Sequence, residues 1–537
     1  LIIITYFLWN VKGEKKIFKA EAEPLVQSSL LLICCICCCG REKGVVKWVR
    51  RLKKVGMAMK RYGWLLVLLV ALTLSACGEN QLPPEPEEGV LIYAALNPVT
   101  DKLTRSVRDF NKNHPDVQIE IRDYSDEGGL ERLQTELVLG VVPDIMELRY
   151  YGKSGEDKRK PYGQNPLPGS YTGPAEGYWM PYRQMAQKGY LEDLWPYIEN
   201  DPELGREGVL EAPLKSAEVN DGLYMLFGRF IIFTLIGRES VVGTRYSWTL
   251  DDVMETLAAM PEGSTVLRYN MTKQAAFFNL LSYSLERYVD RKTGTCYFES
   301  ESFRDLVGFL DGLPDETDPE KAQDAEDQII QQIKDGRQML EGMSIVWPRN
   351  ISTADSLFQE RAAFPGYPTS NGSSGSFFYL TGTVLGMSST CQNKDAAWDY
   401  IRTLITPHTR KNKGSILFAQ IANTPVNLND YEAICWYELE IMADTIRMYP
   451  QNPLEHIPPY RHFRSGPEIP LMELLTEEHL QRHRDLIDHT TQLFWPEDEL
   501  ANIVWETLGP YFAGDRTLDD TIALLQNRVG LYLNEQK

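Results

Sequence analysis

The sequence predicts an α/β fold, in which apolar strands alternate with amphipathic helices. Between residues 90 and 148, three apolar strand patterns are separated by two stretches whose apolar residues recur at helical spacing. This alternation is typical of a parallel, doubly wound sheet with helices on its faces. The chain has 537 residues, which exceeds one ordinary domain, so we expect two α/β bodies.

The first strand and the first helix are predicted from the spacing of their apolar residues. Residues 90–94 form a short apolar run that predicts a buried strand. Residues 101–113 follow as a predicted helix, because Leu103, Val107 and Phe110 fall on one face at intervals of three and four. The strand therefore leads into a helix that can cover the sheet.

The next elements repeat this order. Residues 117–121 alternate between apolar and polar side chains, which predicts a second strand. Residues 130–139 are predicted to form a helix that ends near Gly140, and residues 144–148 to form a third strand. Parallel pairing is expected for these strands, since each pair is connected by a helix.

The rest of the chain predicts further helices and one surface insertion. Residues 152–177 are rich in Gly, Pro and charge, which is typical of an exposed loop. Two Thr-Leu-Asp-Asp sequences, at 249–252 and 517–520, are typical of capping boxes and predict helix starts rather than functional sites. The predicted helices cover residues 182–190, 249–260, 327–334, 395–403 and 517–533.

A secretory signal is predicted shortly before the α/β body. Lys60 and Arg61 precede an apolar run at 64–72, which is shorter than the roughly 20 residues that span a bilayer. The tripeptide Leu-Ser-Ala then stands directly before Cys77, and this sequence resembles the lipobox of bacterial lipoproteins. The resemblance implies a signal peptide over 57–76, a lipid on Cys77 and a location at the outer face of the cell membrane.

The segments on either side of this signal are interpreted separately. Residues 1–56 begin with Leu1 and hold five of the nine cysteines, so we interpret them as upstream sequence translated in error. A membrane segment at 25–39 is the alternative. Residues 77–88 are rich in Pro and Glu, which predicts an extended tether.

Charge and cysteine content restrict the function. Residues 77–537 carry 42 Lys and Arg against 71 Asp and Glu, a net charge near −29 with His neutral. Such an acidic chain disfavours nucleic acid and anionic lipid headgroups as partners. Cys296, Cys391 and Cys435 are widely spaced, which leaves either one disulfide with a free thiol or three free thiols.

Seven short segments occur in a fixed order along residues 90–537. They include Phe-Asn-Lys-Asn-His-Pro at 110–115 and Gly-Met-Ser-Ile-Val-Trp at 342–347. In this order they resemble family 1 extracellular solute-binding proteins of ABC importers, a family that includes maltose-binding protein. The segments are 110–121, 139–145, 189–194 with 221–224, 247–252, 342–347, 364–367 with 382–387 and 395–398, and 511–514 with 524–535.

The resemblance implies a two-lobed periplasmic-binding-protein-like fold of type II, in which each lobe is a doubly wound sheet flanked by helices. Residues 89–226 and 360–408 are expected to form lobe 1, and residues 227–359 and 409–537 to form lobe 2. The crossovers between lobes are expected near 226–233, near 358–364 and after Pro407. A solute would then be buried between the lobes as they close about the hinge.

The resemblance also implies a binding function that involves no catalysed reaction. We expect a receptor that captures a solute, with carbohydrate as the expected class, and passes it to the permease and ATPase of an ABC importer. No enzyme activity, cofactor or metal is expected, and the protein is expected to be a monomer held to the membrane by the lipid on Cys77. The chain departs from the family in its long loop at 152–180, in the absence of a Tyr-Asn pair within 227–238, and over 420–495.

Candidate ligand-binding residues were selected for the chemistry of sugar recognition. Aromatic rings cover the apolar faces of a sugar, while short polar side chains bind its hydroxyl groups. The resemblance favours Trp347, which matches an aromatic residue that stacks on sugar in maltose-type relatives. The other candidates follow predicted strands or lie in loops: Asn97, Tyr150, Tyr151, Trp179 and Tyr379.

A metal-binding lipoprotein is one alternative function. Five of the seven histidines lie between positions 456 and 489, and Glu478, His479 and His483 place possible zinc ligands one helical turn apart. The pattern is not His-Glu-x-x-His, so it supplies no protease base, and solvated histidines on a polar helix face explain it more simply.

A secreted hydrolase that acts on glycans is the other alternative. Residues 372–376, Gly-Ser-Ser-Gly-Ser, do not match the Gly-x-Ser-x-Gly spacing of a nucleophile elbow, because position 376 is Ser. Glycosidases use a pair of carboxylates, and the chain has too many acidic residues for one pair to be identified from the sequence. The segment is therefore predicted to be a flexible loop.

Overall fold

The computed structural model of the chain separates into two units, Leu1–Pro83 and Pro84–Lys537. The structure describes residues 88–150, 178–267, 272–290, 293–315, 325–369, 372–406, 423–457, 459–461, 468–494 and 500–535, all of them in the second unit. The predictions for residues 1–56, the signal peptide, Cys77 and most of the tether therefore lie outside the described residues.

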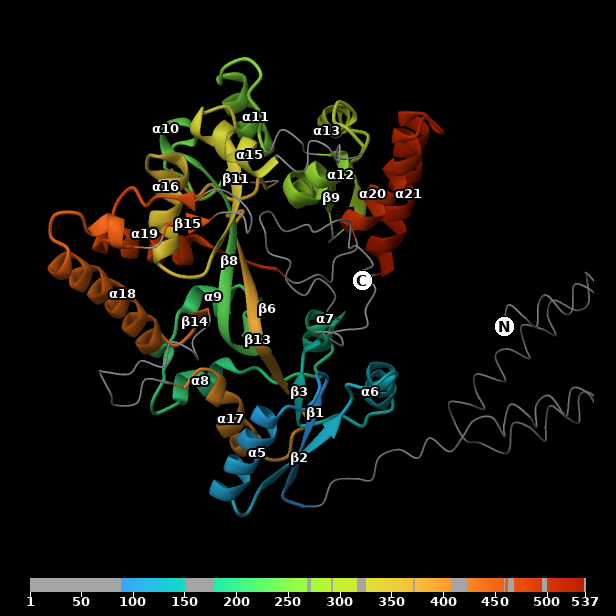
Figure 1. The fold of residues 1–537 in the computed structure, drawn as a ribbon. Helices are drawn as coiled ribbons and strands as arrows, with labels where there is room; N and C mark the ends of the chain where they lie inside the picture. Colours follow the sequence, from blue (N-terminus) through green and yellow to red (C-terminus); the bar gives the residue numbers. More distant parts are fainter. Residues whose placement is uncertain are drawn as a thin grey trace, which may run out of the picture. The chain divides into compact units, whose positions relative to one another are not determined.

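The second unit has the predicted α/β fold: a mixed sheet flanked by helices (Figure 1). Within the described residues the sheet has nine strands, six of them in the order β11-β8-β13-β3-β1-β2, with β12 and β14 beside β8 and β17 beside β13. The strands are β1 (Val90–Ala95), β2 (Gln118–Asp123), β3 (Ile145–Glu147), β8 (Leu226–Arg238), β11 (Leu340–Ile345), β12 (Ala362–Ala363), β13 (Phe377–Met387), β14 (Thr424–Pro425) and β17 (Gln492–Leu493).

Strand pairing is parallel at one end of the sheet and antiparallel in its middle. β1 pairs in parallel with both β2 and β3, as the alternating pattern predicts. β13 runs antiparallel to both β3 and β8. The parallel pairing predicted for the three strands between residues 90 and 148 is therefore confirmed, whereas the antiparallel position of β13 between β3 and β8 was not predicted.

β8 and β13 are the longest strands of the sheet and run through the centre of the second unit (Figure 1). Around one end of this pair lie β1, β2 and β3 with their helices, and around the other end lie β11, α10, α11, α15 and α16. Ten of the thirteen residues of β8 are buried, so this strand is covered on both faces. The predicted division into two lobes would have its first crossing within β8.

The helices are α5 (Asp101–Asn113), α6 (Gly129–Val138), α7 (Tyr182–Gln187), α8 (Trp195–Asn200), α9 (Glu211–Lys215), α10 (Glu239–Val242), α11 (Leu250–Ala258), α12 (Lys273–Ala276), α13 (Glu301–Asp311), α15 (Ala325–Lys334), α16 (Arg349–Phe358), α17 (Lys394–Ile401), α18 (Leu428–Met448), α19 (Glu477–His489), α20 (Leu500–Phe512) and α21 (Leu518–Glu535). Short strands are β4 (Arg149–Tyr150), β5 (Tyr178–Trp179), β6 (Glu218–Val219), β7 (Gly222–Leu223), β9 (Val289–Asp290), β10 (Thr295–Cys296), β15 (Tyr460–Arg461) and β16 (Glu468–Ile469).

Side-chain caps set the starts of several helices. The Thr100 hydroxyl accepts a hydrogen bond from the backbone N–H of Leu103, and α5 spans the residues predicted from its apolar spacing. At α11 the predicted capping box is confirmed: the Thr249 hydroxyl accepts from Asp252 N, and the Asp252 carboxylate accepts from Thr249 N. Local sequence therefore determines where these helices begin.

Among the residues that the structure describes, the apolar core contains two large clusters and a small one. The first packs the helices against β1 and β3 and continues along β8 to α16, with Leu133 and Leu357 among its members. The second joins α11, α13, α20 and α21, with Val253 and Leu525 among its members. The small third cluster lies around Tyr379 and forms part of the candidate site.

The structure also bears on membrane-spanning helices and on the pairing of the cysteines. No helix among the described residues is long and apolar enough to cross a membrane. Cys296, Cys391 and Cys435 are all free thiols, which decides between the two alternatives left open by their spacing.

Gly228 on β8 offers a stability test with an internal control. A Cβ atom at Gly228 would lie 2.2 Å from the carbonyl oxygen of Leu404, whereas a Cβ at Gly308 in α13 meets nothing within 4 Å. We expect Gly228→Ala to lower the free energy of unfolding by about 1–3 kcal/mol. Gly308→Ala should raise it by up to about 1 kcal/mol because Gly is a poor helix former. Urea titrations measure both; equal effects would contradict this close approach.

Candidate functional site

A buried carboxylate organises the loop that follows β1. Glu147, at the end of β3, accepts hydrogen bonds from the Tyr93 hydroxyl at 2.9 Å and from the backbone N–H of Leu96 at 2.9 Å. It also accepts from the backbone N–H and the side-chain amide of Asn97, both at 2.8 Å. Four donors from β1 and its loop thus converge on one side chain, which fixes Asn97 relative to β3.

Burial affects the ionisation of both acids in this group. It raises the pKa of the Glu147 carboxyl, while the hydrogen bonds from Asn97, Tyr93 and Leu96 act in the opposite direction. Burial and the neighbouring Glu147 raise the pKa of Tyr93 well above its ordinary value. The Tyr93 phenol therefore stays protonated and serves as a donor.

Arg149 connects this loop to the central strand β13. The side-chain amide of Asn97 donates to the Arg149 carbonyl oxygen at 2.7 Å. The buried Arg149 guanidinium donates to the Leu380 carbonyl oxygen and, at 2.5 Å, to the Tyr379 hydroxyl. Its Cζ lies 4.9 Å from the centre of the Tyr379 ring, within cation–π range. Asn97 and Tyr379, far apart in sequence, are therefore joined through one residue.

Tyr379 lies in a small aromatic cluster. Its ring meets Phe233 edge to face, with centres 5.1 Å apart, and lies 5.8 Å from Phe494. Val346 packs against the same cluster, and Trp347 follows it directly in the chain. The structure thus brings Asn97, Tyr379 and the start of the Trp347 turn into one neighbourhood. Trp347 itself is half-buried.

The remaining candidates lie beside Arg149 or outside the described residues. Tyr150 is in β4 and Trp179 in β5, and these strands pair so that Arg149 is opposite Trp179 and Tyr150 opposite Tyr178. Tyr151 and the proposed lipidation residue Cys77 lie outside the described residues. Sequence reasoning missed Glu147 and Arg149, although an acidic residue inside an apolar strand and a cation directly before Tyr150 were visible signals.

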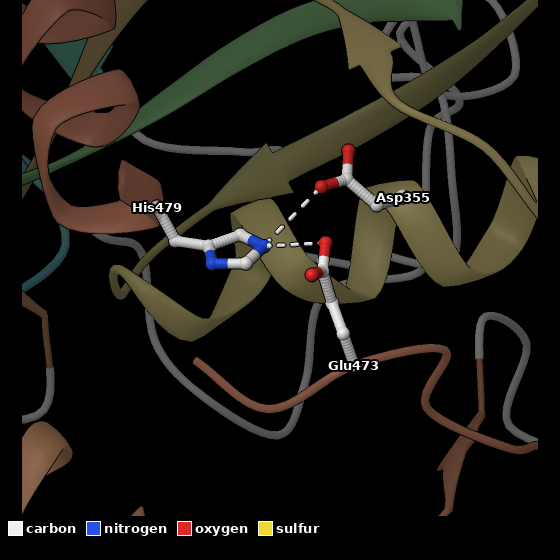
Figure 2. Close-up of side chains that lie close together, drawn as sticks. All are labelled: Asp355, Glu473 and His479. Carbon is white, nitrogen blue, oxygen red and sulfur yellow. Dashed lines mark ion pairs between the residues drawn. The ribbon is translucent and has the colours of Figure 1, made fainter. Parts of the chain in front are cut away.

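A second polar group lies between α16 and α19. Nε2 of His479 is 3.3 Å from a carboxylate oxygen of Asp355 and 3.3 Å from one of Glu473 (Figure 2). Asp355 and His479 are buried, whereas Glu473 is exposed. Within the described residues, these are the three side chains whose ligand atoms lie close enough together to hold a metal ion.

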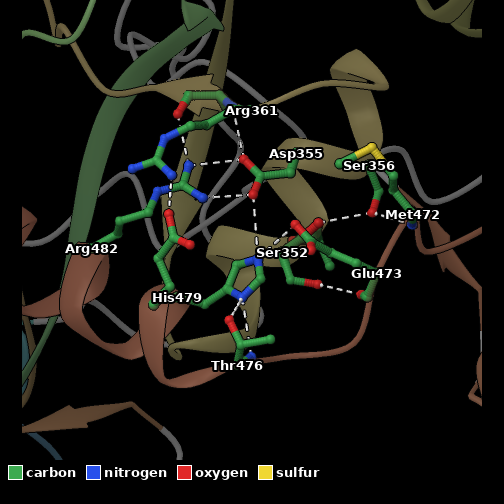
Figure 3. Close-up of polar contacts among 12 residues, drawn as sticks. Ser352, Asp355, Ser356, Arg361, Met472, Glu473, Thr476, His479 and Arg482 are labelled. Atoms are coloured by element: carbon green, nitrogen blue, oxygen red, sulfur yellow. Dashed lines mark hydrogen bonds and ion pairs between the residues drawn. The ribbon is translucent and has the colours of Figure 1, made fainter.

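The hydrogen bonds around His479 argue against a metal there. Its Nδ1 accepts from the backbone N–H of Thr476 at 3.1 Å, so the imidazole proton is on Nε2, the atom that faces both carboxylates (Figure 3). A metal ligand needs a lone pair at that atom. Arg482 also donates to both oxygens of Asp355, at 2.6 and 2.8 Å. The group is therefore a hydrogen-bonded ion network that fastens α19 to α16.

The residues of the metal-binding alternative do not converge. Glu478 pairs with Arg361 on the protein surface, away from the Nε2 of His479. His483 is buried, its Nδ1 lies 2.9 Å from the Tyr431 hydroxyl, and burial lowers its pKa to about 3. The one-turn spacing of these side chains therefore reflects three separate packing roles.

The segment at 372–376 also lacks the features of a nucleophile elbow. Ser374 and Ser376 are buried, and the Ser376 hydroxyl lies 2.8 Å from that of Thr234. A Cβ at Gly375 would lie 1.7 Å from the carbonyl oxygen of Tyr367, so the chain packs tightly here. The prediction of a flexible loop was wrong for this reason, although the rejection of an elbow agrees with the packing.

A surface pocket of about 390 Å³ lies elsewhere, between α8 and α17. Tyr197 and Trp398 form its aromatic wall. Its buried carboxylate, Asp201, is already paired with Arg402 at 2.6 Å and accepts from the Trp398 ring N–H. These contacts account for the burial of Asp201 without a ligand, and none of the predicted site residues lines this pocket.

No protein-family model matches the chain, and no curated protein matches it. Among solved structures, a family 1 extracellular solute-binding protein of Alicyclobacillus acidocaldarius is 14% identical, covers 84% of this chain and 100% of its own, and gives a TM-score of 0.42. The sugar-binding protein MalE of Xanthomonas citri is 15% identical, with 83% and 98% covered and a TM-score of 0.41. A de novo designed cysteine esterase is 12% identical, with 84% and 100% covered and a TM-score of 0.44.

The ionic pairing of Asp355 predicts a specific pH dependence. Burial acts to raise the pKa of Asp355, but hydrogen bonds from Arg482 and His479 outweigh it and hold this pKa below its usual range. A lowered pKa stabilises the fold above the unfolded-state value near 4, and this contribution is lost as the pH falls through the folded-state value. Asp355→Asn should therefore destabilise the protein strongly at pH 7 and much less at pH 3.

Thermal unfolding at both pH values measures this difference. Asp519→Asn is the matched control, because Asp519 forms an exposed pair with Arg304 and should contribute little at either pH. A penalty for Asp355→Asn that is the same at pH 3 and pH 7 would contradict the ionic role.

Proposed function

We propose that this protein is a lipid-anchored extracellular receptor that captures a solute, with carbohydrate as its class, and delivers it to the permease of an ABC importer. The proposal rests on the lipobox before Cys77, on the seven ordered sequence segments and on the arrangement of side chains around Arg149. Capture would occur in a cleft between two lobes, with no covalent step.

The observation that carries the proposal is that Arg149 joins two candidates, Asn97 and Tyr379, beside the cluster against which Val346, at the start of the Trp347 turn, is packed. Asn97 follows the carboxyl end of β1, Arg149 follows that of β3, and Trp347 follows that of β11. In open α/β sheets, ligands bind at the carboxyl ends of strands. Hydrogen bonds connect Asn97 to Arg149 and Arg149 to Tyr379, and Val346 connects this group to Trp347.

The composition of this group suits a polar, uncharged solute with apolar faces. Aromatic rings can lie on the C–H face of a sugar, while amide and hydroxyl groups bind its edge. Glu147 and Arg149 bind neighbouring side chains and the backbone, which orients the residues around them. Binding and release need only a change in lobe position, consistent with a receptor rather than an enzyme.

Anchoring explains how a protein of this kind would work with a transporter. A lipid on Cys77 and the Pro-rich tether would hold the body near membrane proteins while leaving it mobile in the plane of the membrane. The protein would act as a monomer. Its partners would be the permease subunits of an ABC importer, which in turn carry the ATPase.

Solute binding by the mature protein in detergent tests the receptor function. Calorimetry against mono- and oligosaccharides should give a saturable signal, and Trp347→Ala should weaken it about tenfold or more, equivalent to 1.4 kcal/mol. Trp436→Ala, an exposed residue on α18, is the control and should leave affinity unchanged. No binding to any sugar, together with binding to peptides or Zn²⁺, would reject the carbohydrate class.

Membrane attachment is tested separately with Cys77→Ser in the full chain. Without the acceptor thiol we expect the protein to be released to the medium or to keep its signal uncut. Fractionation and the mass of the mature protein measure both results. A variant that stays in the membrane fraction with the wild-type mass would reject lipidation at Cys77.

A further inference from the structure

The turn that presents Trp347 lies between β11 and α16 and has no cap of the ordinary kind. Pro348 occupies the N-cap position of α16 and makes no side-chain hydrogen bond there. The first N–H groups of a helix have no acceptor within the helix, so other groups must accept their hydrogen bonds. At the start of α16 the backbone N–H groups of Asn350 and Ile351 donate to the carbonyl oxygens of Trp347 and Pro348, at 2.9 and 3.0 Å. The N–H of Arg349, the first residue of the helix, instead takes its acceptor from elsewhere in the chain.

Two neighbouring side chains hold the backbone of the turn. The Asn350 side-chain oxygen accepts from the backbone N–H of Val346 at 2.9 Å and of Trp347 at 2.8 Å. The Thr424 hydroxyl, on β14, donates to the Val346 carbonyl oxygen at 2.6 Å. The peptide group between Val346 and Trp347 is therefore held at its carbonyl oxygen by Thr424 and at its N–H by Asn350.

A third contact comes from α18, 89 residues further along the chain. One carboxylate oxygen of Glu438 accepts from the backbone N–H of Arg349 at 3.2 Å, and the other accepts from the Arg349 Nε at 2.7 Å. A second guanidinium nitrogen of Arg349 also donates to this carboxylate. Glu438 is only 1% exposed, whereas the Arg349 side chain is half-exposed.

This placement makes Glu438 a tertiary cap for α16. A negative charge at a helix N-terminus is favoured by the helix dipole, and a charged acceptor binds a backbone N–H more strongly than a neutral one. The backbone N–H that it binds belongs to Arg349, two residues after Trp347. A single proline, Pro348, therefore separates the residue that Glu438 binds from Trp347.

We propose that Glu438 is a positioning residue for Trp347: it sets the orientation of the ring and, through it, the affinity for the solute. The part that concerns affinity rests on the proposed function. α18 belongs to residues 420–495, where the sequence shows little signature of the solute-binding family it resembles.

The orientation of Trp347 can be measured without any ligand. The full mature protein is labelled with 5-fluorotryptophan, and the Trp347 resonance in the ¹⁹F spectrum is assigned by its loss in Trp347→Phe. Glu438→Gln keeps the shape of the side chain and removes its charge, so we expect this resonance to shift or broaden. Glu432→Gln, an exposed site on the same helix, is the matched control and should leave it in place.

Affinity is then measured with the sugar that the wild-type protein binds best. A ring that is no longer held in place must be ordered on binding, which costs on the order of 1 kcal/mol, so Glu438→Gln should weaken binding about fivefold, and Glu432→Gln should not. Asn350→Ala should act in the same direction, since it removes two hydrogen bonds from the turn. Equal thermal unfolding of Glu438→Gln and Glu432→Gln would show that the effect is not a general loss of stability.

The outcomes separate the two levels of the proposal. An unchanged Trp347 resonance in folded Glu438→Gln would overturn the positioning role, whatever the protein binds. A shifted resonance with unchanged sugar affinity would overturn the link to the solute. Absence of sugar binding in the wild type would instead reject the proposed function, and the spectroscopic result would still decide whether Glu438 positions Trp347.

Discussion

The antiparallel pairing of β8 with β13 is the interaction on which the rest of the structure depends. β13 connects the sheet to β3 and, through it, to β1 and β2, while β8 connects it to β11, β12 and β14. The pair runs from Phe377 opposite Phe233 to Leu385 opposite Leu226, with one irregularity between Thr381 and Val384. Because both strands are largely buried, most of their backbone groups must find hydrogen-bond partners inside the protein, and this ladder supplies many of them.

The candidate site depends on this pair for its geometry. Tyr379 is part of β13, Arg149 follows the strand that pairs with β13, and Trp347 follows the strand that pairs with β8. A change of register by one residue would turn Tyr379 to the other face of the sheet and separate it from Arg149. The candidate side chains are thus brought together by strand order rather than by proximity in sequence.

Local patterns predicted the elements whose stability is local. The apolar spacing of α5 and the capping box of α11 gave their positions, and the alternation of strands and helices gave the parallel pairing of β1 with β2 and β3. The antiparallel centre of the sheet could not be predicted, because an apolar run does not encode its partner. For the same reason the sequence showed the candidate residues Asn97 and Tyr379 but neither the Arg149 that joins them nor the carboxylates of Glu147 and Glu438.

The internal hydrogen bonds of the site bear on how tightly it could bind. Holding a flexible side chain in place on binding costs about 0.5–1.5 kcal/mol. Asn97 is already held by Glu147 and the Arg149 carbonyl, Tyr379 by Arg149, and the Trp347 turn by Asn350 and Glu438. Much of this cost is therefore met during folding, by buried polar groups that need not touch a ligand. In such a site, affinity depends on residues behind the contact surface as much as on those that form it.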